Sequence, residues 1–372
     1  MRRTPKENIN QSFINLIRKA HGLIENSDIE KHRHSQDQMG ALFGNSREVA
    51  VTETTVGSMY AEWIRVDRPH SGKKIILYCH GGGYSTGSPL YARTLTTKLA
   101  SQLSMDVFCF DYRLAPEHPY PAAVDDAQAA WDFLMLQGYG AKDIFVAGDS
   151  AGGNLALALG LRLKKQKRML PAGFVLMSPW TDLTVSGKTH ETKADVDPVL
   201  NQNYLNEMIE NYVPQAKKVQ MEAVKPLQEG NTIRAAGTLQ EGSTIQAAGT
   251  LQEGNTLQTA NPLQTAGTEK QKPGDKSANK VFEEIFDTEY LRNPEISPLF
   301  GDFTGFPPTY IQVGDLEVLM SDSTMLQKKM SGDGVAVSLD TYKNMWHVFQ
   351  MGPFKTAVEA IHKCGEFIYS VQ

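Results

Sequence analysis

Residues 144–159 read IFVAGDSAGGNLALAL. The stretch starts with four apolar residues, the pattern of a buried strand, and ends with NLALAL, which favours a helix. Between the two lies GDSAGG, whose first five letters fit Gly-x-Ser-x-Gly. A strand, this glycine pattern and a helix, in that order, predict a nucleophile elbow, a sharp turn that projects the Ser150 hydroxyl above the strand ends. The alternative is an ordinary glycine turn before a helix.

Short apolar runs alternate with helical patterns along most of the chain. The apolar runs cover residues 59–66, 75–79, 107–110, 144–147, 174–178, 310–313 and 335–339, and the helical patterns lie near 90–103, 122–137, 150–167, 320–331 and 355–370. Strands separated by helices predict βαβ units and a mostly parallel sheet, so the expected fold class is α/β. Near the start, apolar residues on one face of 8–25 predict a helix that either docks on the body or covers a site.

The composition bears on partners and location. The chain has 372 residues, of which 41% are hydrophobic and 21% charged, with a formal net charge of −5. Phosphate binding needs a concentrated basic face, so we do not expect nucleic acid as a partner. We expect no membrane span, because no run of about 18 apolar residues is present, and we expect no signal peptide after the polar start. Cys79, Cys109 and Cys364 lack CxxC spacing and are expected to be buried free thiols, which favours a cytoplasmic location.

A twelve-residue repeat interrupts the α/β pattern. LQEGNTIRAAGT at 227–238 is followed by LQEGSTIQAAGT, LQEGNTLQTANP and the partial copy LQTAGT, which ends at residue 268. Each copy is rich in Gly, Thr, Gln and Ala and has too few apolar residues to bury much surface. We expect a weakly ordered insertion over 214–285. A short stacked array of β-turns and a partner-binding arm are the alternatives, and the composition does not decide between them.

A second glycine motif, His80-Gly81-Gly82-Gly83-Tyr84, directly follows the apolar run 75–79. Acyl transfer needs preorganised N–H donors for an oxyanion, and adjacent glycines let the backbone turn so that amides point inward. An HGGG loop is the usual partner of the nucleophile elbow, so Gly82, Gly83 and Ala151 are the candidate donors. His80 is expected to be a hydrogen-bonding loop anchor, and Tyr84 either lines a pocket or fills space. A phosphate-binding loop is disfavoured because neither GxxxxGK[ST] nor GxGxxG occurs here.

The elbow also requires a base and an acid. In chains with this elbow the order is serine, acid, histidine. His347 lies in a loop between a strand and the last helix, whereas His362 lies inside that helix and is read as structural. Asp315 and Glu317 both fall on the turn after the apolar run 310–313, and either could accept a hydrogen bond from an imidazole. Asp322 lies a turn further on and is a weaker candidate.

Several motifs in this order make the chain similar to one known family. They are His80-Gly81-Gly82-Gly83, Asp111-Tyr112-Arg113-Leu114-Ala115-Pro116-Glu117, Pro121-Ala122-Ala123-Val124-Asp125-Asp126, Gly148-Asp149-Ser150-Ala151-Gly152-Gly153, Ser178-Pro179-Trp180-Thr181-Asp182 and Met345-Trp346-His347-Val348-Phe349. The chain resembles the hormone-sensitive-lipase-like family of α/β-hydrolases, which includes many bacterial carboxylesterases. The resemblance runs from about residue 74 to 371, without the repeats.

The resemblance implies an α/β-hydrolase fold, with a mostly parallel eight-stranded sheet flanked by helices and covered by a helical cap. The implied division is N-terminal cap helices at 1–50, a catalytic domain at 51–185 and 286–372, a cap segment at 186–213, and the insertion at 214–285 with its repeats at 227–268. The family's acid opens an acid-x-Leu motif, which Glu317-Val318-Leu319 fits and Asp315-Leu316-Glu317 does not. We therefore choose Glu317, although many members have Asp there.

The expected protein is a serine carboxylesterase that hydrolyses short-chain esters through an acyl-enzyme, with Ser150, Glu317 and His347 as the catalytic residues. A non-catalytic small-ligand-binding module on the same fold, an amidase and a deacetylase are the alternatives. A module of this kind in the gibberellin receptors lacks the histidine that His347 provides here. No cofactor and no metal site are expected. The expected partner is a small ester, and a homodimer is a candidate assembly.

Overall fold

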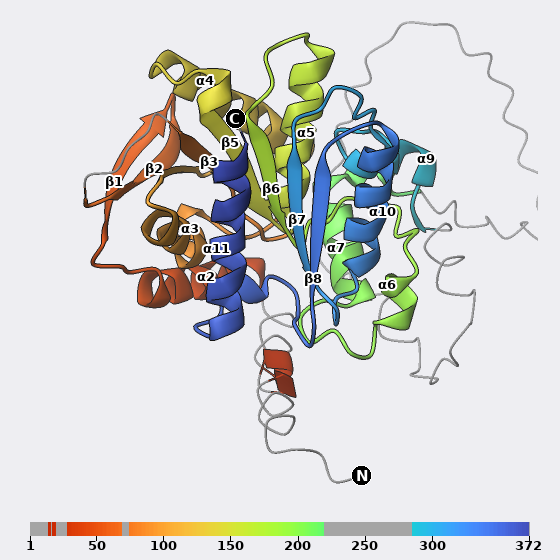
Figure 1. Cartoon of the computed structure of the whole chain (residues 1–372). Helices are drawn as coiled ribbons and strands as arrows, with labels where there is room; N and C mark the ends of the chain where they lie inside the picture. Colours follow the sequence, from red (N-terminus) through yellow and green to blue (C-terminus); the bar gives the residue numbers. More distant parts are fainter. Residues whose placement is uncertain (1–13, 16, 20–27, 69–73, 219–284, 372) are drawn as a thin grey trace, which may run out of the picture. The chain divides into compact units, whose positions relative to one another are not determined.

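The computed structural model describes residues 14–15, 17–19, 28–68, 74–218 and 285–371 (Figure 1). Residues 14–15 and 17–19 are helical, and the rest of the helix expected over 8–25 lies outside the described residues. The repeats at 227–268 also lie outside them, so the expectation of a weakly ordered insertion stays a prediction. The division into domains likewise stays a prediction.

An eight-stranded sheet forms the centre of the described chain. Its order is β1-β2-β4-β3-β5-β6-β7-β8, in which β1 and β2 run antiparallel to their neighbours and the other pairs are parallel. The strands are β1 Val49–Val56, β2 Met59–Val66, β3 Ile75–Cys79, β4 Asp106–Phe110, β5 Ile144–Asp149, β6 Gly173–Met177, β7 Thr309–Gly314 and β8 Val337–Tyr342. The predicted α/β class and mostly parallel eight-stranded sheet are confirmed.

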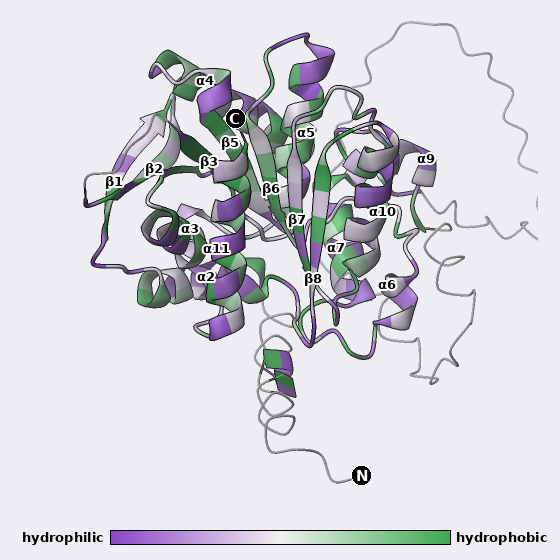
Figure 2. Cartoon of the chain, viewed as in Figure 1, coloured by the Kyte–Doolittle hydropathy of each residue, from purple (hydrophilic) through white to green (hydrophobic). Residues whose placement is uncertain are grey.

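Helices cover both faces of this sheet (Figure 1). The α-helices are α2 Ile29–Phe43, α3 Pro89–Leu103, α4 Ala122–Leu136, α5 Ala151–Lys165, α6 Thr189–Thr192, α7 Gln202–Tyr212, α9 Thr288–Leu291, α10 Met320–Gly332 and α11 Lys355–Ser370. Short 3₁₀ turns are η1 Ala141–Asp143, η2 Pro214–Ala216, η4 Pro298–Phe300 and η5 Phe349–Met351. Hydrophobic residues dominate the central strands, whereas α11 carries both hydrophobic and hydrophilic residues (Figure 2).

Alternation along β3 explains the two hydrophobic cores. Ile75, Leu77 and Cys79 pack with α4, α5 and α10, whereas Ile76 and Tyr78 pack with α3 and α11. Successive side chains of a strand point to opposite faces, so a strand covered by helices on both sides is apolar throughout. This requirement explains why the central strands were recognisable as continuous apolar runs.

The apolar pattern of the sequence did not indicate β1 or α2, although the family resemblance implied helices within residues 1–50, where α2 lies. β1 reads VAVTETTV and is an edge strand in which exposed and half-buried residues alternate, so it has no apolar run. The buried residues of α2 are His32 and Gly40, not an apolar stripe. A Cβ added at Gly40 would lie 2.0 Å from the Leu90 carbonyl oxygen, so the glycine lets α2 approach α3 closely. Close backbone packing of this kind leaves no hydrophobic period in the sequence.

The two ends of the segment that lies outside the structure are paired with each other. Lys217 and Phe286 form an antiparallel bridge. The Lys218 amide donates to the Ile285 carbonyl at 2.8 Å, and the Asp287 amide donates to the Ala216 carbonyl at 2.7 Å. Residues 216–218 and 285–287 therefore lie side by side, shortly after helix α7. A segment inserted at such a closed stem leaves the flanking backbone in register.

Candidate active site

Ser150 lies at the turn between β5 and α5. Its backbone has φ 55° and ψ −122°, a strained conformation for a residue with a Cβ. A Cβ on Gly152 would lie 2.0 Å from the Cys79 carbonyl oxygen, and one on Gly148 would lie 2.3 Å from the Gly152 carbonyl oxygen. Both positions of the glycine pattern are thus needed for α5 to start against β3 and β5. The strain at Ser150 is held by the packing around it.

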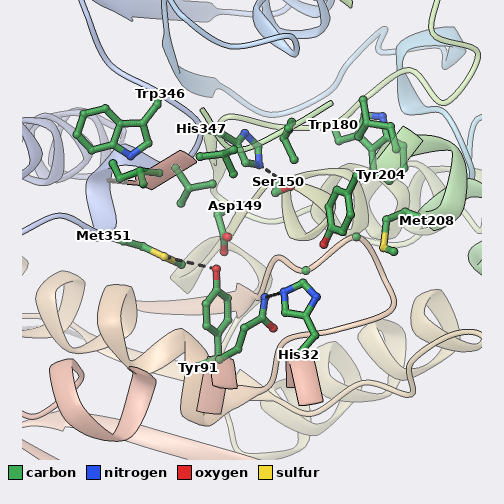
Figure 3. A pocket seen from close by; sticks show the side chains of 18 of the residues that line it. His32, Tyr91, Asp149, Ser150, Trp180, Tyr204, Met208, Trp346, His347 and Met351 are labelled. Carbon is green, nitrogen blue, oxygen red and sulfur yellow. Dashed lines mark hydrogen bonds between the residues drawn. The ribbon is translucent and has the colours of Figure 1, made fainter. Parts of the chain in front are cut away.

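The His347 imidazole lies beside the Ser150 hydroxyl (Figure 3). Its Nε2 is 2.9 Å from Ser150 Oγ, and its Nδ1 is 3.0 Å from Glu317 Oε2. Ser150 follows β5, Glu317 follows β7 and His347 follows β8, so all three leave the carboxyl edge of the parallel sheet. His347 is 8% exposed and Glu317 is 0% exposed. The structure therefore brings together the three residues that the sequence proposed as catalytic.

The alternative acids have other partners. Asp315 Oδ1 accepts a 2.6 Å hydrogen bond from the Asn344 amide. Asp322 Oδ1 accepts from the Thr181 and Asp182 amides, and its Oδ2 lies 3.3 Å from His190 Nε2. Neither carboxylate faces His347. Glu317 instead folds back over its turn, where its Oε1 accepts from the Gly314 amide at 2.5 Å.

Ser178 connects Glu317 to the loop that carries His347, a place that its sequence motif did not indicate. Its Oγ donates to Glu317 Oε1 at 2.7 Å and accepts from the Val348 amide at 3.2 Å. These contacts close a ring, because Glu317 also lies against the imidazole of His347, and His347 directly precedes Val348 in the chain. The only sequence signal was that Ser178 opens the Ser-Pro-Trp-Thr-Asp motif.

The surroundings of His347 favour its protonated form. Burial alone would lower the pKa of His347, but the hydrogen bond to Glu317 and the negative charges of Glu317, Asp197 and Asp149 outweigh burial and raise it. Asp197 is itself almost fully buried, which raises its pKa to about 6. An imidazole that accepts a proton readily, next to a serine hydroxyl, is suited to general-base chemistry.

The glycine loop after β3 is held open toward Ser150. Gly82 and Gly83 have φ 118° and 60°, and both line the cavity above the serine. Within the described part of the chain, no group accepts a hydrogen bond from either amide. Asp149, which the sequence analysis passed over, fixes the base of this loop, because its Oδ1 accepts from the Gly81 amide at 3.0 Å and from Tyr78 Oη at 2.6 Å. Ala151 is the first residue of α5, where backbone amides have no partner within the helix.

His80 and Tyr84 support the loop from behind. The buried His80 ring stacks on Tyr112 with centroids 4.1 Å apart, and its Nδ1 lies 2.8 Å from the Gly81 carbonyl oxygen. Burial lowers the pKa of His80 to about 4, so the ring is neutral near neutral pH. Tyr84 donates to Asn154 Oδ1 at 2.8 Å and stacks on Tyr212 of α7 with centroids 3.7 Å apart. Of the two readings left open for Tyr84, the packing one fits, since it does not line the cavity.

A cavity of about 270 Å³ lies over Ser150 and His347 (Figure 3). Its wall is mostly apolar and comes from α2, α7 and the loops at the sheet edge. The lining includes Met39, Val199, Leu200, Leu205, Met208, Trp346, Val348 and Met351. Besides Ser150 and His347, the polar side chains that line the cavity include His32, Gln36, Tyr91 and Tyr204. A small, mainly apolar substrate with one reactive polar group suits such a cavity.

Two further properties concern only the described residues. They contain no group of three or more His, Cys, Asp or Glu side chains placed to hold a metal ion. None of their helices combines the length and the apolar character that crossing a bilayer requires. The three cysteines are free and buried.

Comparisons with known proteins agree with this geometry. The chain matches the model of a family described as the alpha/beta hydrolase fold, over residues 76–270 and 238–351. An esterase of Acinetobacter venetianus is 31% identical over 337 residues, which cover 90% of this chain and 87% of that esterase. An acetyl-hydrolase of Streptomyces hygroscopicus is 30% identical over 324 residues, which cover 87% of this chain and 83% of that protein.

Solved structures place the chain more narrowly. A hormone-sensitive lipase from a metagenome library has a TM-score of 0.71 at 31% identity, and the match covers 97% of both chains. An esterase from the bacterial hormone-sensitive lipase family has a TM-score of 0.72 at 25% identity, over 100% of this chain and 99% of that one. The chain therefore belongs to the α/β-hydrolase family, within the hormone-sensitive-lipase-like group of carboxylic ester hydrolases.

Proposed function

We propose that this protein is a serine carboxylesterase that cleaves short-chain esters, with Ser150 as nucleophile, His347 as general base and Glu317 as the orienting acid. One observation supports this proposal above all others. The Ser150 hydroxyl, the His347 imidazole and the Glu317 carboxylate form a row with contacts of 2.9 Å and 3.0 Å beneath a cavity. These contacts are within hydrogen-bond reach, as nucleophilic catalysis requires.

In the acylation step, His347 Nε2 takes the proton of Ser150 Oγ as the oxygen attacks the ester carbonyl carbon. Glu317 accepts the hydrogen bond from Nδ1–H and stabilises the imidazolium that forms. The developing oxyanion accepts hydrogen bonds from the amides of Gly82, Gly83 and Ala151. The carbon–oxygen bond to the alcohol then breaks, and the imidazolium gives its proton to the leaving alkoxide.

Deacylation repeats the same steps with water. His347 takes a proton from a water molecule as that molecule attacks the acyl-serine carbonyl carbon. The bond between this carbon and Ser150 Oγ then breaks, and His347 gives its proton to Oγ. The products are a carboxylic acid and an enzyme in its starting state. No step needs a group beyond the side chains and amides named here.

The size and lining of the cavity support short acyl chains. A volume of about 270 Å³ leaves room for a small ester. The mostly apolar wall favours an unbranched hydrocarbon acyl chain and disfavours a charged one. The names of two similar proteins, an esterase and an acetyl-hydrolase, are consistent with a small acyl group. Acetyl and butyryl esters are therefore the first substrates to test.

The test compares wild type with Ser150→Ala on p-nitrophenyl esters of increasing acyl length. We expect hydrolysis of acetate and butyrate esters by wild type, a decline toward dodecanoate, and a loss of about 10⁵-fold or more in Ser150→Ala. Equal rates for the two proteins would contradict the proposal. Running p-nitroacetanilide in parallel distinguishes an amidase, which would cleave the anilide as fast as the ester.

A further inference from the structure

Lys98 is a half-buried cation that the mechanism above does not use. It lies on α3, and its Nζ donates to the main-chain oxygens of Gln350 at 3.1 Å, Met351 at 2.7 Å and Gly352 at 3.0 Å. Among the described residues, no carboxylate forms an ion pair with it. An ammonium withdrawn from water has three N–H donors to satisfy, and here three carbonyl oxygens accept hydrogen bonds from it.

These carbonyls end the loop that carries His347. Gln350 and Met351 belong to η5, the 3₁₀ turn that starts two residues after His347, and Gly352 is its C-cap. The last carbonyls of a helical turn have no partner within it and carry partial negative charge, which a cation satisfies. At its other end, the loop is held by the Val348 amide, which donates to Ser178 Oγ at 3.2 Å. Val348 lies in the left-handed region with φ 51°, so the loop makes a sharp turn between the two attachments.

We propose that Lys98 is a positioning residue, which holds the loop end after His347 so that the imidazole stays within reach of Ser150. This inference rests on the proposed role of His347 as the base. The ammonium gathers three carbonyls at one point and thereby determines where η5 lies against α3. Loss of the cation would release that end and widen the distribution of distances between Nε2 and Oγ. Displacing a catalytic group by about 1 Å can cost about 10²-fold in rate.

Two other side-chain contacts hold this loop: a weak one with Tyr91 of α3 and one with Gln312 of β7. Tyr91 Oη lies 3.4 Å from Met351 Sδ, a weak interaction. The Gln350 side chain donates to Gln312 Oε1 at 3.0 Å, on the side of the sheet strands. Lys98 is thus the residue that connects the main chain of η5 to α3 through several strong donors.

The charge of Lys98 depends on pH in an accessible range. Burial lowers the pKa of Lys98 to about 8. Charged groups on the elements around Lys98 have partners of their own. Arg93 of α3 forms an ion pair with Glu62 of β2, and Asp37 of α2 accepts a hydrogen bond from Ser88. On α11, Lys355 pairs with Glu359 and Lys363 pairs with Asp340 of β8. The loop itself contains His347, and the titratable side chains of Tyr91 and Glu317 contact it at Met351 and His347 respectively.

The sign of the pH effect separates activity from folding. The pKa of Lys98 in the folded protein is lower than that of a free lysine. Above about pH 8 the unfolded chain therefore binds more protons than the folded protein does. As pH rises through this range, Lys98 thus increases the free energy of unfolding. Neutral Lys98 is a weaker donor to the carbonyls, so kcat should fall over the same range. A decline in kcat without a decline in stability is therefore the expected signature.

The experiment uses Lys98→Met with Lys74→Met as the matched control. Lys74 Nζ also donates to main-chain carbonyls at a helix end, those of Ile368 at 3.4 Å and Val371 at 3.0 Å. It precedes β3, however, and so lies at the opposite edge of the sheet from Ser150. Both variants are assayed on p-nitrophenyl butyrate from pH 6 to 10, with urea unfolding measured in parallel.

We expect Lys98→Met to lower kcat by about 10- to 100-fold with KM within about threefold, since most of the cavity lining belongs to elements other than this loop. Lys98→Arg, which keeps the cation, should recover most of kcat, and Lys74→Met should keep wild-type kcat. The decline of wild-type kcat above about pH 8 should be absent in Lys98→Met.

The proposal is wrong if Lys98→Met and Lys74→Met lose the same stability and both keep wild-type kcat. If Lys98→Met does not fold, Lys98→Gln takes its place, and failure of that variant to fold would make the residue a general structural one and overturn the proposal. His347→Ala is included as a reference. Wild-type activity in His347→Ala would refute the proposed function itself, whereas an inactive His347→Ala beside a fully active Lys98→Met would refute only the role of Lys98.

Discussion

The nucleophile side and the histidine side of the site are built in different ways. On the nucleophile side, Ser150 and the Gly82–Gly83 loop are placed by backbone geometry: positive φ angles and glycines that admit close contacts between main chains. On the histidine side, Glu317 and His347 are placed by side-chain hydrogen bonds to Ser178 and, in our proposal, by Lys98. The first kind of placement is written in short motifs, whereas the second depends on residues far apart in the chain.

The difference predicts how each side fails. Backbone placement is intolerant, because a single added Cβ meets main-chain atoms that cannot move aside. Placement by polar side chains is graded, because each hydrogen bond can be weakened by one substitution while the others remain. Substitutions on the two sides should therefore differ in the size of their effect and in how it divides between kcat and stability.

The largest effect is expected from Glu317→Gln, which removes the charge that orients and stabilises the His347 imidazolium. We expect kcat to fall by about 10²- to 10⁴-fold, with KM little changed, as when the acid of such a triad is neutralised. Asp315→Asn is the matched control. The Asp315 carboxylate lies on the same turn as Glu317, and it accepts a hydrogen bond from the Asn344 amide. A greater loss of kcat in Asp315→Asn than in Glu317→Gln would reverse the assignment of the acid.

On the backbone side, Gly82→Ala should reduce kcat by about 10²- to 10³-fold, because turning one amide away removes an oxyanion donor. A Cβ at Gly82 would lie 2.2 Å from the Thr86 carbonyl oxygen, so the loop must shift to admit it. Gly57→Ala is the control: Gly57 also has a positive φ, +61° against +118° at Gly82, but no atom lies within 4 Å of the added Cβ. Equal kcat in the two variants would show that the Gly82 amide is not a donor in the reaction.

A smaller effect is expected from Ser178→Ala on the histidine side. Glu317 keeps its contacts with the Gly314 amide and His347, so we expect about a 10-fold loss of kcat and a loss of about 1–3 kcal/mol in the free energy of unfolding, since the buried Val348 amide loses its acceptor. Kinetics and urea denaturation measure the two quantities. A loss of stability without any loss of kcat would make Ser178 a packing residue only.

The smallest effect is a shift of a pH profile. His347 must be neutral to act as the base, and its pKa is raised, so kcat/KM should fall as pH decreases through a value above 6.5. The stability that the charged imidazole provides has the opposite trend: it is fully present below pH 6.5 and is lost as pH rises through the raised pKa. In Glu317→Gln the acidic limb of the rate profile should move to lower pH. An unmoved limb would show that Glu317 does not control the titration of His347.

The features that the sequence predicted and those that it did not predict divide in a similar way to the two sides of the site. The continuous apolar strands and the two glycine motifs identified the α/β class and the sheet, because those patterns arise from contacts within a few residues or from burial on both faces. The apolar pattern did not indicate strand β1, which is a half-exposed edge, or helix α2, which docks through Gly40; only the family resemblance implied helices in the region of α2. The candidate serine and histidine could be named from motif and order, and their catalytic roles stay proposals.

The sequence by itself identified the nucleophile side, because its glycines stand in two short motifs, Gly-x-Ser-x-Gly and HGGG. The atoms that an added Cβ would meet, such as the Cys79 carbonyl oxygen at Gly152, lie far away in the chain. It left two carboxylates on one turn as candidate acids, and a family resemblance was needed to choose between them. Only the tertiary structure brought Glu317 rather than Asp315 to the imidazole, joined Ser178 to Glu317 and to the Val348 amide, and placed Lys98 beside the loop of His347. Those contacts span up to 254 residues of sequence, and no local pattern encodes which distant side chains the fold will bring within 3 Å of each other.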